Sequence, residues 1–155
     1  DLQTPLTDEF GKKFSLSQMK GQTTIMSMAY TSCKGSCPVI IQKMKVLNQE
    51  FLKKGKKFNF LIVTFDPETD TPAVLHEYRN KTDFHDDNFI FLHSTPKETR
   101  KFSMHVGIRY SKDTDGSIMH DNKITAVSKT GKVIAEQDNL NHSFEEFIKK
   151  VLDET

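Results

Sequence analysis

One stretch of the sequence decides the fold: Thr24-Ile25-Met26-Ser27-Met28-Ala29-Tyr30-Thr31-Ser32-Cys33-Lys34-Gly35-Ser36-Cys37-Pro38. Its β-branched and apolar start is typical of a buried central strand, and Pro38 is placed for the first turn of a helix. Both cysteines of the chain lie at this strand-to-helix junction. A helix N-terminus presents unpaired N–H groups and the positive end of the helix dipole, which favour a thiolate. We therefore expect acidic thiols that are redox-active or bind a metal.

The segments outward from this stretch alternate between helix and strand. Apolar residues at helical spacing predict a helix from Pro38 to Gly55, and the run over residues 57–65 predicts a second central strand. Thr71-Pro72 and Thr95-Pro96 each join a capping threonine to a proline in the first turn. The other predicted elements are a helix over 72–81, a strand over 89–92, a helix from 95 to about 105, a hairpin over 123–135 and an amphipathic helix over 144–152.

The residue pattern of the N-terminal region predicts two short strands around a glycine turn within residues 8–16. A one-turn helix over residues 17–21 is predicted to follow them. This order of elements predicts a single α/β domain over residues 1–155. Its mixed central sheet has helices on both faces and begins with a β-hairpin. Residues 1–6 are expected to be a flexible remnant of a leader.

Composition excludes several classes of function. The 155 residues carry a net charge of +1, which gives no field for attracting nucleic acid or an anionic membrane. No stretch approaches the roughly 18 apolar residues of a membrane helix, and residues 1–4 lack the features of a signal peptide. We expect a mature or trimmed soluble domain with one core of its own.

The number and spacing of the cysteines limit which metal ions they could bind. Three residues separate Cys33 from Cys37, whereas the common thioredoxin-type dithiol has two. Two thiolates and one imidazole satisfy a soft ion such as Cu(I), while structural zinc usually takes four protein ligands. A buried disulfide, or a pair of inert core thiols, is the alternative.

The six histidines supply candidates for the third ligand. His120 is the strongest, because it lies in a loop over residues 116–121 from which its imidazole could swing over the end of the sheet. His93 follows a strand and is a weaker candidate. From the residues alone, a surface role for His120 remains open. The histidines expected to be solvated or to cap helices are His76, His85, His105 and His142.

The chain resembles the Sco/SenC family in three places: residues 30–33 with Cys37-Pro38, the string Phe65-Asp66-Pro67-Glu68-Thr69-Asp70-Thr71-Pro72, and His120 before the last hairpin. The resemblance implies a thioredoxin-like three-layer fold. It also implies copper, Cu(I) or Cu(II), as the cofactor, bound by Cys33, Cys37 and His120.

The resemblance further implies a copper chaperone of cytochrome c oxidase assembly. Its partners would be a copper donor and the copper-bearing subunit of the oxidase, where it delivers copper to the binuclear centre. The expected location is extracytoplasmic, in the bacterial periplasm or at the membrane surface, or in the mitochondrial intermembrane space. The natural chain would be membrane-anchored through a segment absent here.

Five residues near the expected ligands have an interpretation of their own. Lys34 and Gly35 stand where the family commonly has proline and aspartate, and a lysine beside Cys33 should depress its pKa further. Met119 could offer a thioether to Cu(I) or pack under the loop. Asp66 ends the strand beside the cysteine strand and could orient a ligand through a hydrogen bond, or only build the loop with Asp70.

Other functions remain open. In a thiol-disulfide oxidoreductase, Cys33 would attack a partner disulfide and Cys37 would resolve the mixed disulfide. A copper or redox sensor would use the same residues. A peroxiredoxin-type cysteine is usually preceded by a threonine and a proline, whereas those places hold Tyr30 and Met26.

Overall fold

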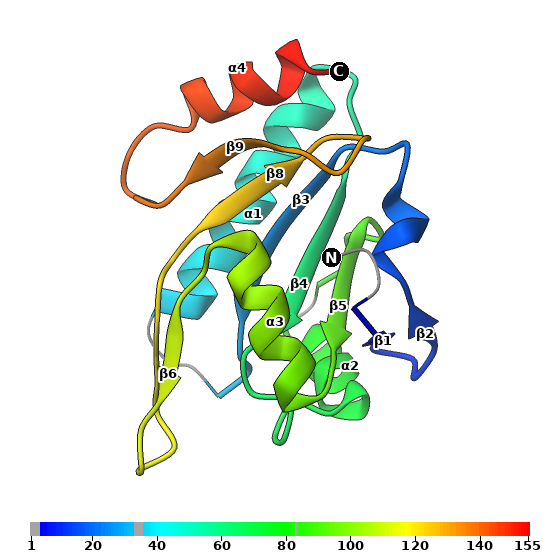
Figure 1. Ribbon diagram of the computed structural model, residues 1–155. Coiled ribbons are helices and arrows are strands. Elements are labelled where there is room, and N and C mark those ends of the chain that lie inside the picture. Colours follow the sequence, from blue (N-terminus) through cyan, green and yellow to red (C-terminus); the bar gives the residue numbers. More distant parts are fainter. Residues whose placement is uncertain (1–3, 33–35, 83) are drawn as a thin grey trace.

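A computed structural model describes residues 4–32, 36–82 and 84–155, and for residues 36–38 it describes the backbone alone (Figure 1). The helices are the 3-10 helix η1 (Leu16–Met19), α1 (Ser36–Lys53), α2 (Pro72–Lys81), α3 (Pro96–Val106) and α4 (Glu145–Asp153). The strands are β1 (Leu6–Asp8), β2 (Lys13–Phe14), β3 (Thr24–Ala29), β4 (Asn59–Thr64), β5 (Phe89–His93), β6 (Tyr110–Lys112), β7 (Ile118–His120), β8 (Ile124–Val127) and β9 (Val133–Gln137).

Within the described residues, seven strands form one mixed sheet in the order β2-β1-β5-β4-β3-β8-β9. The three central strands, β3, β4 and β5, run parallel, while β1 and β8 pair antiparallel on either side. β6 and β7 form a separate two-stranded sheet. The predicted mixed sheet with an N-terminal hairpin is confirmed.

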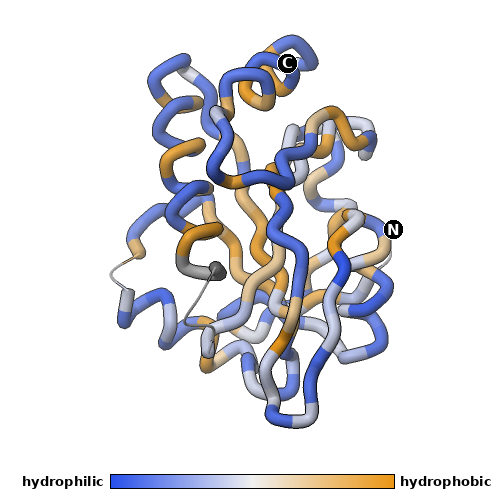
Figure 2. Tube along the Cα trace, turned by 90° about the vertical axis from the view of Figure 1, so that its left-hand side faces the viewer, coloured by the Kyte–Doolittle hydropathy of each residue, from blue (hydrophilic) through white to orange (hydrophobic). Residues whose placement is uncertain are grey.

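Side chains that alternate along each central strand divide the core into two layers, because successive residues point to opposite faces. Ile25 and Phe60 belong to the layer beneath α1, α2 and α4. Met26 and Leu61 belong to the layer beneath α3 and η1. Figure 1 shows α3 crossing one face of the sheet and α1 the other, and in Figure 2 the hydrophobic residues follow the central strands.

The predicted helix starts are confirmed in detail. The Thr71 hydroxyl accepts from the Val74 amide at 3.3 Å and the Thr95 hydroxyl from the Glu98 amide at 3.2 Å, and a proline follows each cap. Gly107 ends α3 at φ +70°, a conformation that glycine adopts without strain. These caps fix where the loops at the ends of β4 and β5 turn into helices.

Two expectations are wrong. Residues 4–6, assigned to a flexible leader remnant, belong to the fold: Thr4 is buried, the Ser94 hydroxyl donates to the Pro5 carbonyl, and Leu6 begins β1. Residues 116–121, expected to be a loop, include β7, which pairs with β6 in a hairpin. Residues 1–3 lie outside the described residues. Among the described helices, none combines the length and apolar composition needed to cross a bilayer.

Replacing Phe60 by Ala tests the aromatic layer beneath α1. Phe60 is fully buried and its ring stacks on Phe89 at 4.6 Å, so Phe60→Ala should lower the free energy of unfolding by about 3–5 kcal/mol. Urea denaturation measures this. The control is Phe10→Ala, which removes a ring that is 69% exposed and should change stability by about 0.5 kcal/mol or less. Equal losses would contradict the assignment of Phe60 to the core.

Candidate metal centre

The ends of β3 and β4 lie side by side at one edge of the sheet. The parallel register pairs Ala29 with Thr64, and the Phe65 amide donates to the Ala29 carbonyl at 2.9 Å. The segments that follow, residues 30–32 and 65–70, therefore meet at this edge. Sites of open α/β sheets form at the carboxyl ends of parallel strands.

The segment that carries both cysteines, residues 33–37, is called the dithiol segment here, and it connects this edge to α1. Cys33 lies outside the described residues, and for Cys37 the structure gives only the backbone, in the first turn of α1. The roles of both cysteines therefore stay predictions. Among the side chains that are described, no three His, Cys, Asp or Glu residues form a metal-holding group.

The carboxylate of Asp70 fixes the backbone that leads to Cys33. Asp70 is fully buried, and it accepts hydrogen bonds from the Thr31 amide at 3.0 Å, from the Thr31 hydroxyl and from the Thr64 hydroxyl at 2.6 Å. Asp70 itself is held by its amide, which donates to the Asp66 carbonyl at 2.8 Å. The sequence indicates only a tight loop for Asp70 and gives no sign of the contact with Thr31.

His120 comes to the same edge from the β6–β7 hairpin. Its ring lies 4.8 Å from that of Phe65, which follows β4, and 5.9 Å edge-on from that of Tyr30, which follows β3. The prediction that His120 reaches the end of the sheet is consistent with these contacts. Its ring, however, extends from a strand and not from a loop.

A hydrogen bond sets the tautomer of His120. Nδ1 lies 3.0 Å from the backbone carbonyl oxygen of Asp121. A carbonyl oxygen can only accept, so Nδ1 carries the proton and a neutral ring has its lone pair at Nε2. Metal-binding histidines in proteins usually donate their other ring N–H to a carbonyl or carboxylate in this way.

Alternation along the hairpin separates His120 from Met119. Tyr110 pairs with His120 and Ser111 with Met119, so Met119 faces away from His120. The Met119 side chain is 67% exposed. Its expected packing under the loop is wrong, and its thioether points away from the imidazole.

Asp66 contacts the hairpin that carries His120. Its buried carboxylate lies 2.8 Å from Nζ of Lys112 on β6, and this hydrogen bond raises the pKa of the Lys112 ammonium. At the base of the hairpin, a hydrogen bond from Arg109 lowers the pKa of the Asp121 carboxyl. Asp66 therefore does more than build its loop.

Of the other histidines, His93 contacts the turn after β4, while His76 and His105 lie elsewhere. His93 Nε2 lies 2.9 Å from the Pro67 carbonyl, and His76 Nδ1 lies 2.9 Å from the Glu9 carboxylate. His105 is exposed in the last turn of α3. His120 is thus the histidine that the fold brings beside the ends of both β3 and β4.

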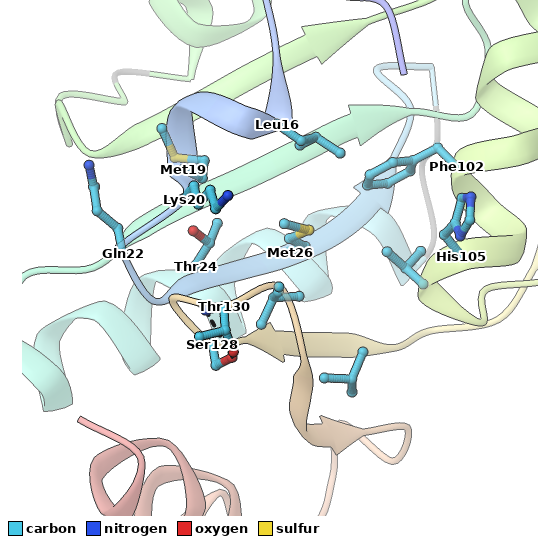
Figure 3. A pocket seen from close by; sticks show the side chains of 14 residues that line it. Leu16, Met19, Lys20, Gln22, Thr24, Met26, Phe102, His105, Ser128 and Thr130 are labelled. Atoms are coloured by element: carbon cyan, nitrogen blue, oxygen red, sulfur yellow. Dashed lines mark hydrogen bonds between the residues drawn. The ribbon is translucent and has the colours of Figure 1, made fainter. Parts of the chain in front are cut away.

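A cavity of about 330 Å³ lies at the opposite end of β3 (Figure 3). Thr24 and Met26 of β3 line it together with Leu16 of η1 and Phe102 of α3. Because Thr24 begins β3 and the dithiol follows its end, this cavity is separate from the candidate metal centre.

The parallel core with a dithiol segment between β3 and α1 defines the class of thioredoxin-like proteins. Within it, the chain belongs to the SCO1/SenC family, whose model matches residues 4–154. A SCO2-like protein of Rickettsia typhi is 29% identical over 135 residues, which cover 83% of this chain. A SCO1 protein homolog of Bacillus subtilis is 25% identical over 147 residues, covering 91% of this chain and 75% of the relative. The aligned part is 65% of the Rickettsia protein.

Solved structures agree on the fold. A SCO1/SenC family lipoprotein from Bacillus anthracis superposes with a TM-score of 0.89 at 23% identity, covering 99% of this chain and 94% of that one. ScoI of Bradyrhizobium japonicum, solved with copper bound, superposes at 0.79 with 25% identity, covering 98% and 97%. BsSco, described as having a disulfide switch and as a cytochrome c oxidase assembly protein, superposes at 0.83 with 21% identity, covering 96% and 88%.

Asp70→Asn tests the anchor of the dithiol segment. The substitution puts an NH₂ group where one carboxylate oxygen accepts, so a buried donor of Thr31 or Thr64 loses its acceptor. We expect the free energy of unfolding to fall by about 1–3 kcal/mol, with faster hydrogen exchange at the Thr31 amide. Asp138→Asn, at an exposed position, is the control. Unchanged exchange at Thr31 would contradict this role.

Proposed function

We propose that this chain is a metallochaperone that binds copper through Cys33, Cys37 and His120. It delivers the ion to the binuclear copper centre of cytochrome c oxidase, outside the cytoplasm, with the natural chain anchored at a membrane. Family membership and the copper-bound relative support the proposal. The main structural observation behind the proposal is the position of His120. Its ring lies beside the ends of β3 and β4, and its Nδ1 donates a proton to a carbonyl.

The donor set fits the chemistry of copper. Two thiolates and one imidazole are soft and borderline ligands that suit Cu(I), and three ligands leave a low coordination number. The N-terminus of α1 favours the thiolate form of Cys37, which lies in its first turn. Copper is the cargo here, and a thiolate shared with the acceptor protein provides a path for its transfer.

The three ligands would come from elements held in different ways. The cysteines flank the start of α1, whereas His120 belongs to a hairpin outside the main sheet. Transfer by ligand exchange needs one ligand that leaves before the others. His120 suits that role, because in the described structure its strand pairs with β6 and not with a strand of the main sheet.

His120→Ala tests the third ligand. Copper(II) affinity should fall at least about a hundredfold, since residues that only orient a ligand typically cost about 10–100-fold. The thiolate-to-copper absorption should shift, while the circular dichroism of the copper-free protein stays unchanged. The control is His105→Ala, on the exposed face of α3. An unchanged absorption spectrum would contradict the role of His120.

A thiol-disulfide oxidoreductase is the second candidate, favoured by the dithiol segment at the start of α1 and by the disulfide switch described for BsSco. Cys33 thiolate attacks a partner disulfide to form a mixed disulfide, and Cys37 then displaces the partner's thiol. The partner gains two electrons and two protons, and a Cys33–Cys37 disulfide remains. An extracytoplasmic reductant must restore the dithiol.

Cys37→Ser separates the two functions. If Cys37 resolves mixed disulfides, this variant should accumulate a covalent complex with the oxidase subunit or another partner bearing a disulfide, detected on a non-reducing gel. Cys33→Ser is the matched control and should trap nothing. If neither variant forms a complex while the wild-type chain binds copper, the oxidoreductase reading fails.

A further inference from the structure

The hairpin that carries His120 has no strand pairing with the main sheet in the described structure. β6 and β7 pair only with each other, and Figure 1 shows the hairpin extending past the end of the sheet. Side-chain contacts therefore fix its position. Ile118 of β7 is buried in the core, and the Tyr30 hydroxyl donates to the Ile118 carbonyl at 3.5 Å. Near its base, Arg100 of α3 donates to the Tyr110 carbonyl at 2.7 Å and lies over the Tyr110 ring at 3.8 Å.

Farther along the hairpin, Lys112 makes the ionic contact with the main fold. Its Nζ donates to Oδ1 of Asp66 at 2.8 Å, and the two side chains are 41% and 6% exposed. Lys112 lies two residues from Tyr110, the cross-strand partner of His120, and so on the same face of the hairpin. The ion pair thus acts on the face that presents the imidazole.

The turn over residues 66–70 holds both sides of the candidate metal centre. Its Asp70 carboxylate binds the backbone and hydroxyl of Thr31, two residues before Cys33. Its Asp66 carboxylate binds Lys112 on the His120 hairpin. Asp66 is itself fixed, because its amide donates to the Thr64 hydroxyl at 2.9 Å. One turn therefore sets Thr31 and the hairpin relative to each other.

We propose that Lys112 is a positioning residue for copper: its ion pair with Asp66 holds the hairpin so that His120 stays within reach of the thiols. This inference rests on the proposed function. Without Lys112, the hairpin keeps the core packing of Ile118 but loses its ionic contact with the main fold, and a buried carboxylate loses its partner. The imidazole then spends less time at the metal, and copper leaves faster.

Lys112→Gln tests this role, with Lys57→Gln as the matched control. Lys57 also pairs with a carboxylate, Asp87, at 2.9 Å, but it precedes β4 and so lies at the other end of that strand from Asp66. The dissociation rate of Cu(II) into a chelator should rise about tenfold in Lys112→Gln and stay unchanged in Lys57→Gln. Lys112→Arg, which keeps the charge, should restore most of the wild-type rate. Equal rates in the Gln variants would overturn the proposal.

A double-mutant cycle shows whether Lys112 acts through His120. In the His120→Ala background, Lys112→Gln should add no further increase in the dissociation rate. A full additional increase would mean that Lys112 does not act through the imidazole, which overturns the proposal.

A copper-free measurement separates this proposal from the proposed function. Hydrogen exchange at the hairpin amides of the apo protein should be faster in Lys112→Gln than in Lys57→Gln and wild type. If wild-type protein fails to bind copper, the proposed function fails, whatever the exchange shows. If hairpin exchange does not change in Lys112→Gln, the positioning role fails even when copper binds.

Discussion

The buried carboxylate of Asp70 is the contact on which the candidate centre depends. It gathers donors from Thr31 and Thr64, which follow and end two neighbouring parallel strands. A carboxylate without access to water is stable only when such donors surround it, so the turn, the end of β4 and Thr31 form as one unit.

Most of the fold could be predicted because its signals are local. The Thr71-Pro72 and Thr95-Pro96 pairs mark helix starts that the structure shows as capped first turns. The run Thr24–Ala29 is buried along its whole length, as expected for a central parallel strand. β6 and β7 were not predicted, because each strand has only three residues of mixed polarity, which is too few to show a periodicity.

The candidate site was less accessible from the sequence. His120 could be named through the resemblance to a family, but its place on a strand, which decides that Met119 faces away, needs the register of the hairpin. The contacts of Asp70 with Thr31 and of Asp66 with Lys112 join residues 39 and 46 positions apart. No local pattern encodes such pairs, since they depend on which strands become neighbours.

The edge strands of the main sheet affect how readily this protein pairs with strands of other proteins at high protein concentration. β2, at one border, is two residues long and carries the exposed Lys13, while β9, at the other, carries the exposed Glu136. A short or charged border strand is a poor template for adding a foreign strand. The chain can therefore approach other proteins closely with little tendency to polymerise through its backbone.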